Sequence, residues 1–301
     1  MFTIVEFPSE GATLRGRLYI PENQSPPSPI VIMAHGFSAT INGMVADRYA
    51  EVFHNAGYAV LLYDHRNFGI SDGEPRQKIN EWIQARSYLD AITFVTALPE
   101  FDTDRIAIWG DSIGGAQVVM VGAVDPRVKA IVAQVPAFGD EPPPPDPDGL
   151  LFAAFRETLL NGDISNMPQS TTETLPVVSF DQLNNPSHIP TVTAFRWFIE
   201  YGGRYGTNWE NWATVVERET STPIHPGLCT PYIKAPMLLV IAHDDEVPGA
   251  SSHIVRMAFD LDPESKELVE TDGGHFGLLY YPSSVFDHAS SSQRDFLERN
   301  L

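Results

Sequence analysis

The chain has 301 residues, of which 43% are hydrophobic and 19% are charged, so it carries enough apolar material for a sizeable core and is not a disordered protein. Its 19 basic and 39 acidic residues give a formal net charge of −20, which argues against nucleic acid and anionic membranes as partners. A single cysteine, Cys229, permits no intramolecular disulfide and no cysteine-based metal site. The first residues do not resemble a secretory signal and no apolar run is as long as a membrane span, so we expect a cytoplasmic protein.

The first half of the chain alternates between strand-like and helix-like patterns, which is typical of βαβ units over a mostly parallel sheet. Continuous apolar runs predict strands buried on both faces, and an alternating run predicts a half-exposed one. The expected strands are 13–20, 29–34, 58–63, 105–109 and 129–135. Two helices are expected between them, one over 47–56 that ends at Gly57 and one whose buried face carries Trp82, Ala85, Tyr88, Leu89, Ile92 and Val95.

The alternation stops at a proline run, residues 141–148, which can form neither helix nor central strand because proline has no N–H to donate. From there to about Pro231 the pattern is helix- and turn-like and rich in aromatic residues. Strands are again expected at 237–241 and 267–270, followed by a terminal helix. The sequence therefore predicts an α/β fold with a mostly parallel central sheet and helices on both faces. Its core would comprise residues 1–138 and 232–301, interrupted by an inserted helical lid at 139–231.

The sequence Gly110-Asp111-Ser112-Ile113-Gly114 lies directly after a predicted buried strand and before a helix-compatible stretch, 116–123. This is the G-x-S-x-G pattern of a nucleophile elbow, and it lies at a predicted strand-to-helix junction, as such an elbow requires. Small residues two before and two after the serine prevent collisions in the tight turn, and the helix N-terminus points its free N–H groups at developing negative charge. We expect Ser112 to be the nucleophile.

A serine hydroxyl needs a base to remove its proton, and the order in this type of fold is serine, acid, histidine. His275, in a glycine-rich loop after the last strand, is the expected base. Asp244, Asp245 and Glu246 compete for the role of the acid after the 237–241 strand. The D-x-x-V-P spacing favours Asp244, with Asp245 and Glu246 solvated or capping the helix expected to start near Val247 and Pro248.

An oxyanion hole requires two backbone N–H donors. The expected donors are those of Ile113, which follows the nucleophile, and Phe37, in the loop after the first buried strand. His35 is expected to brace that loop, and the charged cluster at 64–66 to support a neighbouring loop through an internal ion pair. The trio 243–245 has no second cluster at ligand spacing, so neither a metal nor a cofactor is expected.

The predicted lid contains too many aromatic residues for a segment that only faces solvent. We expect the lid to cover Ser112 and form an apolar acyl pocket, with Trp197, Phe198, Tyr201 and Trp209 as its walls. The expected partner is therefore a small-molecule acyl substrate, and a homodimer remains open.

With these motifs in place, the chain resembles the α/β-hydrolase superfamily over nearly its whole length apart from the lid. Residues 35–37, 63–69, 72–77 and 132–136 are similar to a subgroup that contains dienelactone-hydrolase-like and X-Pro-dipeptidyl-peptidase-like bacterial hydrolases and fungal polyketide acyltransferases of the fumagillin pathway type. The chain departs from that subgroup at Gly114, where a second serine is common. Dienelactone hydrolases proper use a cysteine nucleophile, so Ser112 argues against their activity.

The resemblance implies hydrolysis of an ester or thioester through an acyl-enzyme. The alternative is an acyltransferase that passes a polyketide or other acyl chain to an alcohol or amine. A lactonase and a C–C bond hydrolase are also compatible with the same residues. A non-catalytic binding protein on this scaffold would be expected to have a damaged triad, and all three members are present here.

Overall fold

The computed structural model describes residues 1–22, 26–220, 224–261 and 266–301. Its strands are β1 Phe2–Ser9, β2 Ala12–Tyr19, β3 Ser28–Ala34, β4 Ala59–Tyr63, β5 Lys78–Ile79, β6 Phe101–Asp111, β7 Ala130–Gln134, β8 Gln169–Thr171, β9 Thr214–Arg218, β10 Met237–Ala242 and β11 Lys266–Thr271. Its helices are α1 Ala46–Asn55, α2 Glu81–Thr96, α3 Ile113–Val124, α4 Leu150–Asn161, α5 Val192–Trp197, α6 Pro226–Cys229, α7 Ser252–Asp260, α8 Gly274–Gly277 and α9 Ser284–Asn300. Short 3-10 turns occur at Ile164–Asn166 and Thr230–Tyr232, and one π-helical turn occurs at Phe198–Gly202.

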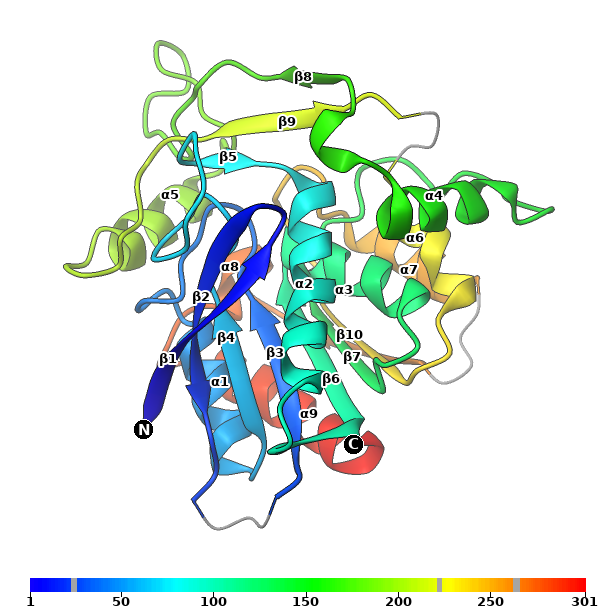
Figure 1. Ribbon diagram of the computed structural model, residues 1–301. Coiled ribbons are helices and arrows are strands. Elements are labelled where there is room, and N and C mark those ends of the chain that lie inside the picture. Colours follow the sequence, from blue (N-terminus) through cyan, green and yellow to red (C-terminus); the bar gives the residue numbers. More distant parts are fainter. Residues whose placement is uncertain (23–25, 221–223, 262–265) are drawn as a thin grey trace.

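Eight strands form the central sheet in the order β1-β2-β4-β3-β6-β7-β10-β11. The pairs β1–β2 and β2–β4 are antiparallel, and the remaining neighbours are parallel. Figure 1 shows the β1–β2 hairpin at one edge of this sheet. In a parallel sheet the strands present their carboxyl ends at one edge, and open sheets of this type bind their ligands there. Ser112, the expected nucleophile, follows β6, near the middle of the sheet.

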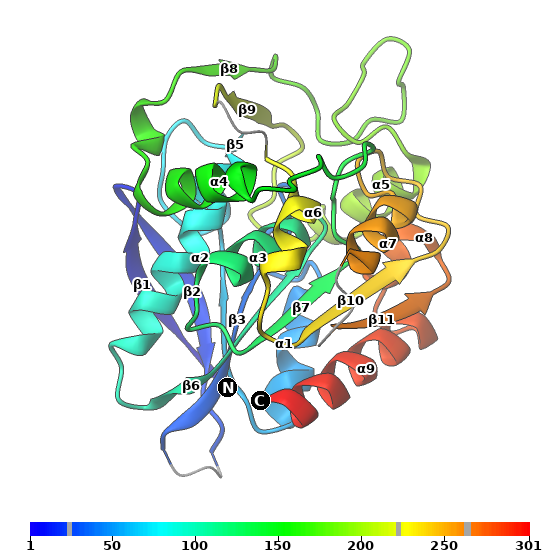
Figure 2. The same ribbon diagram turned by 90° about the vertical axis from the view of Figure 1, so that its right-hand side faces the viewer.

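Helices cover both faces of the sheet, so its central strands are buried on both sides. Along β3, Ile30, Ile32 and Ala34 face a core that includes residues of α2, α3 and α7, whereas Val31 and Met33 face a core with residues of α1 and α9. Figure 2 shows α9 on the opposite side of the sheet from α2 and α3. The predicted α/β-hydrolase fold, a mostly parallel sheet between two helical layers, is confirmed.

The predicted strands and helices of the core occur close to their expected bounds, and Gly57 follows α1 with a φ of +100°. Strand β1 was not predicted. Helix α7 begins at Ser252, where the side chain of Ser251 caps Ile254 N–H, rather than near Val247 and Pro248.

The segment between β7 and β10 contains α4, α5 and α6, as a helical insertion would, and also two strands that the pattern did not predict. Strand β9 pairs with β8 in antiparallel and with β5 in parallel, which makes a second, three-stranded sheet. Because β5 precedes α2 in the predicted core, this small sheet attaches the segment to the rest of the chain, as Figure 1 shows above the central sheet. The division at 139–231 remains our interpretation, and residues 221–223 within it lie outside the described chain. No helix in the described ranges is long and apolar enough to cross a bilayer.

Candidate active site

Ser112 lies in the sharp turn between the last residue of β6 and the first residue of α3, with a φ of +56° and a ψ of −120°. Non-glycine residues rarely adopt a positive φ, and such strain is characteristic of the serine in a nucleophile elbow. The turn is closely packed, because a Cβ on Gly110 would lie 2.3 Å from the carbonyl oxygen of Gly114. The glycine before the serine is thus required by the close approach of the helix to the strand.

His275 belongs to the short helix α8, which follows β11 through the left-handed Gly273. Its Nδ1 lies 2.8 Å from Oδ2 of Asp245, and the two side chains are only 3% and 2% exposed. A carboxylate at Nδ1 of a histidine fixes the tautomer in which Nε2 is free to accept a proton. The carboxylate beside the His275 imidazole is therefore that of Asp245.

Asp244, which the sequence favoured as the acid, does not contact the imidazole in the structure. Asp244 Oδ1 accepts a hydrogen bond from Gly274 N–H at 3.0 Å, while its side chain stays at the exposed surface. Glu246 also contributes, because its Oε2 accepts a hydrogen bond from the backbone N–H of His275 at 3.0 Å. All three carboxylates thus hold the histidine loop, but only Asp245 reaches the imidazole.

The two predicted oxyanion donors flank Ser112. Ile113 is the first residue of α3, and N–H groups in the first turn of a helix have no partner within it. Phe37 lies in the loop after β3, which is held against the elbow by a 2.9 Å hydrogen bond from Gly36 N–H to Asp111 Oδ1. A Cβ on Gly36 would lie 2.8 Å from the Cβ of Ser112, so this loop passes directly beside the serine.

His35 supports the same loop and is buried. Its Nε2 accepts the N–H of Ala46 at 3.3 Å, which leaves Nδ1–H to donate to the Asp111 carboxylate at 3.3 Å. The role predicted for the 64–66 cluster differs in detail. The buried Asp64 carboxylate accepts the N–H groups of Ile41 and Ile70, both at 2.9 Å, so it braces two loops through the backbone rather than through an ion pair.

Two cavities adjoin Ser112. A small one of about 20 Å³ is lined by Ser112 and His275 together with Trp197, Phe198 and Phe276, which shows that Ser112 and His275 face a common space. A larger cleft of about 310 Å³ continues from Ser112 and has mostly apolar walls. Its side-chain walls are Phe37, Ile113, Phe138, His188, Ile189, Ile224, Pro226, Val247 and Pro248, with Glu81 as a carboxyl group.

Of the four aromatic residues expected as pocket walls, Trp197 and Phe198 line the small cavity together with Ser112 and His275. Tyr201 and Trp209 line neither cavity and pack behind them. The hydroxyl of Tyr201 accepts the N–H of Tyr281 at 2.9 Å, and Trp209 stacks on Phe198 with its Nε1–H donating to Ser38 Oγ at 3.2 Å. These two aromatic residues support the walls rather than forming them.

Most of the larger cleft was missed by sequence reasoning. Phe138 follows β7, and the Val247-Pro248 pair was noted only as a helix start. Nothing in the local pattern marks His188 and Ile189, which come from an irregular stretch whose backbone is hydrogen-bonded to 176–177. Non-local folding brings them to the cleft.

The comparisons with known proteins agree with this architecture. A family model described as serine aminopeptidase, S33, matches residues 25–197, which is more than half of the chain. The chain belongs to the α/β-hydrolases. It is therefore an enzyme of a family of serine hydrolases, as its elbow and histidine loop predict.

Three similar proteins illustrate the range of that family. Thiohydrolase aneE of Aspergillus aculeatus is 38% identical over 160 residues, which cover 53% of this chain and 45% of that protein. Quorum-quenching protein AidA of Acinetobacter baumannii is 27% identical over 298 residues, which cover 98% of this chain and 94% of AidA. The crystal structure of the α/β-hydrolase GrgF from Penicillium sp. sh18 has a TM-score of 0.74 at 27% identity, covering 100% of this chain and 99% of GrgF. Further relatives are described as thiohydrolases, an acyltransferase and a polyketide transferase.

Proposed function

We propose that this protein hydrolyses a carboxylic ester or thioester through an acyl-enzyme on Ser112. The observation that carries the proposal is the buried His275–Asp245 pair facing Ser112 across a common cavity. Small-molecule acyl substrates are also implied by the names of the relatives, which include thiohydrolases and an acyltransferase.

In the first half-reaction, Oγ of Ser112 attacks the carbonyl carbon while Nε2 of His275 accepts the hydroxyl proton. Asp245 holds Nδ1–H and stabilises the imidazolium that forms. The negative charge on the carbonyl oxygen is met by the N–H groups of Phe37 and Ile113. The bond to the leaving oxygen or sulfur then breaks, and the leaving group takes the proton from His275.

The second half-reaction uses water as the nucleophile. His275 accepts a proton from the water, whose oxygen attacks the acyl carbon, and then returns a proton to Ser112 Oγ as the acid product leaves. An alcohol or amine in place of water gives acyl transfer with the same residues. That alternative is favoured by the relatives described as an acyltransferase and a polyketide transferase.

The cleft of about 310 Å³ is the proposed site for the acyl chain. Each buried methylene contributes roughly 0.8 kcal/mol, which is about a fourfold gain in affinity for each added carbon until the cleft is full. Trp197 and Phe198 would close the end of the pocket next to the triad, as part of the proposed lid.

The experiment is hydrolysis of p-nitrophenyl esters from acetate to octanoate, with the Ser112→Ala variant as the control for background hydrolysis. We expect kcat/KM to rise with chain length and then level off. A profile that is flat from acetate to octanoate would contradict the acyl cleft, and an unchanged rate for Ser112→Ala would contradict the nucleophile. Adding a primary alcohol and measuring the ratio of ester to acid products distinguishes transfer from hydrolysis.

A further inference from the structure

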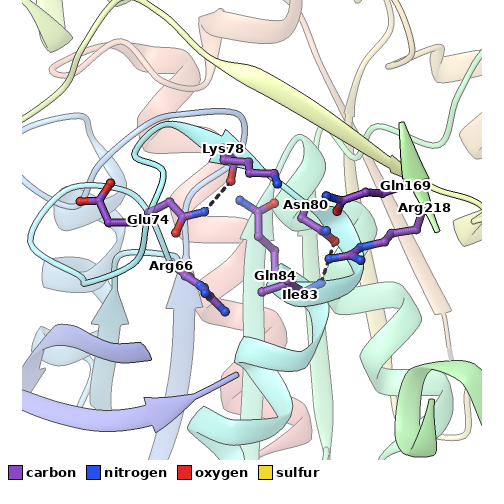
Figure 3. Close-up of a pocket in the computed structure, with 9 residues that line it drawn as sticks. Arg66, Glu74, Lys78, Asn80, Ile83, Gln84, Gln169 and Arg218 are labelled. Atoms are coloured by element: carbon purple, nitrogen blue, oxygen red, sulfur yellow. Dashed lines mark hydrogen bonds between the residues drawn. The ribbon is translucent and has the colours of Figure 1, made fainter. Parts of the chain in front are cut away.

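A second cavity, of about 190 Å³, lies apart from the acyl cleft, between the three-stranded sheet and the first turns of α2. Figure 3 shows the residues that line it. They include Lys78 from β5, Asn80 and Gln84 at the start of α2, Gln169 from β8 and Arg218 from β9, with Arg66 toward one side. All of its lining residues except Ile83 are polar or charged, whereas most residues that line the cleft beside Ser112 are apolar.

The charge of this lining is unusual for the chain. Arg66, Lys78 and Arg218 supply three positive charges against the single carboxylate of Glu74, in a protein whose net charge is −20. Within the described ranges, no carboxylate oxygen lies within ion-pair distance of any of these three cations. Arg66 and Arg218 instead donate to main-chain carbonyls, those of Glu10 and Met167 respectively. A carbonyl bond satisfies the donor but leaves its charge in place.

Two buried donors at the cavity also have no hydrogen-bond partner among the residues that the structure describes. Asn80 is 5% exposed, and its Oδ1 caps α2 by accepting Ile83 N–H at 3.2 Å, so the amide nitrogen is the atom left free. The Nε of Arg218 is likewise buried without a hydrogen bond. A buried donor without an acceptor destabilises the folded state, and such groups are rare in folded proteins.

The electrostatics of Arg218 agree with this description. Burial, followed by repulsion from Arg66, lowers the pKa of its guanidinium below the usual range. Both causes disfavour the charged form of Arg218. The Glu10 carboxylate acts in the opposite direction, and an anion bound close to the guanidinium would add to the effect of Glu10. The α2 N-terminus adds positive potential from the same side, because a helix of 16 residues carries about half a unit charge at that end.

We propose that this cavity is a binding site for a small oxyanion, a carboxylate or phosphate group, held by Arg218, Lys78 and the side-chain amide of Asn80. The oxyanion would accept from Arg218 Nε and from the Asn80 amide nitrogen, the two donors that lack acceptors. Lys78 would supply a second charge. The cavity of about 190 Å³ has room for a phosphate or a short dicarboxylate.

This site is independent of the proposed catalysis at Ser112. The two cavities nevertheless share the first turn of α2, because Asn80 lines the anion cavity and the next residue, Glu81, lines the acyl cleft. The Ser112→Ala variant is therefore a suitable protein for binding measurements, since it keeps the anion cavity and removes turnover.

The test is isothermal titration calorimetry of the full-length Ser112→Ala protein with inorganic phosphate, with succinate and with glycerol as a neutral control, at low ionic strength to limit screening. We expect saturable binding with one site per chain for phosphate, succinate or both, and none for glycerol. Phosphate alone or succinate alone would identify which oxyanion the site prefers. Absence of saturable binding by both anions would overturn the proposal.

Variants in the same background locate the binding. We expect Arg218→Gln to weaken anion binding at least tenfold, and the matched variant Arg196→Gln, at an exposed position on α5, to leave it unchanged. Lys78→Gln, which should weaken binding at least threefold, serves as the second variant if Arg218→Gln does not fold. Equal affinities in Arg218→Gln, Lys78→Gln and Arg196→Gln would place the anion elsewhere and refute the assignment.

Discussion

Exchanging the acid of the histidine pair tests the active-site geometry most sharply, because the chain offers a matched control one residue away. In Asp245→Asn the new side-chain amide lies between two groups, the N–H of Val247 and Nδ1 of His275. Asp245 Oδ1 accepts the N–H of Val247 at 3.0 Å, and Oδ2 meets Nδ1 of His275 at 2.8 Å. An asparagine that keeps its oxygen on Val247 must present its NH₂ group to the imidazole.

That arrangement forces Nδ1 to accept and places the ring proton on Nε2, so His275 can no longer take the proton of Ser112. We expect kcat to fall by about 10⁴, as in triads that lose the tautomer while keeping the geometry, which corresponds to about 5 kcal/mol of transition-state stabilisation. Asp244→Asn keeps an oxygen for Gly274 N–H, and its side chain is exposed, so we expect less than a threefold loss, on the scale of about 0.5 kcal/mol typical of exposed substitutions.

The assay is kcat and kcat/KM for a short p-nitrophenyl ester, with the rate of labelling by a fluorophosphonate as a second measure of Ser112 reactivity. Both measures should fall in Asp245→Asn and stay near the wild-type value in Asp244→Asn. If Asp244→Asn lost more than a hundredfold while Asp245→Asn stayed active, the tautomer argument and the pairing it rests on would be refuted.

Four further outcomes are expected. Ser112→Ala should stay folded, with a thermal midpoint close to that of the wild type, and lose about 10⁶ in kcat; wild-type turnover would contradict this. Gly36→Ala should lose activity and about 1–3 kcal/mol of stability in urea unfolding, because its Cβ would lie 2.7 Å from the Asp111 carbonyl oxygen; unchanged kinetics would contradict the close approach. Burial lowers the pKa of His65 to about 3, so below its ordinary pKa of 6.5 the unfolded state binds a proton that the folded state does not. The free energy of unfolding should therefore fall by about 2 kcal/mol from pH 7.5 to pH 5. His65→Phe should remove this loss, and an equal loss in both proteins would refute the argument. Burial and then the charge of Glu217 raise the pKa of Glu81, so the wild type should lose stability as the pH rises from the ordinary to the raised pKa. Urea titrations at several pH values measure this loss, and Glu81→Gln should not show it.

Sequence reasoning identified the features that depend on local pattern. The strands that carry the centre of the sheet are continuous apolar runs, and the elbow around Ser112 is specified within five residues. The acid could not be chosen in the same way. Asp244, Asp245 and Glu246 are consecutive, and all three hold the His275 loop, so only the three-dimensional path of the chain decides which one reaches the imidazole.

The aromatic walls show a second limit. Trp197 and Phe198 lie beside the triad, but the π-helical turn that starts at Phe198 changes the helical phase, so a 3.6-residue period cannot place Tyr201. Strand β9 was missed for a related reason. Its partner β5 lies more than 130 residues earlier in the chain, and neither strand has a recognisable pattern of its own.

The pairing of β9 with β5 has a consequence for the competition between water and other acceptors. In the segment between β7 and β10, strand β9 is hydrogen-bonded to Lys78 and Ile79 of β5, which directly precede α2. Helix α6 of the same segment packs against α3, the helix that follows Ser112. If this segment covers the acyl-enzyme, as we propose, lifting it away would break the native backbone pairing of β5 with β9. Under this proposal, access to Ser112 depends on how well each acyl chain fills the opening of the cleft beside it. Under the proposed chemistry, a chain that fills it shields its own ester from water, so the fate of the acyl group is decided by the substrate's shape as much as by the enzyme's residues.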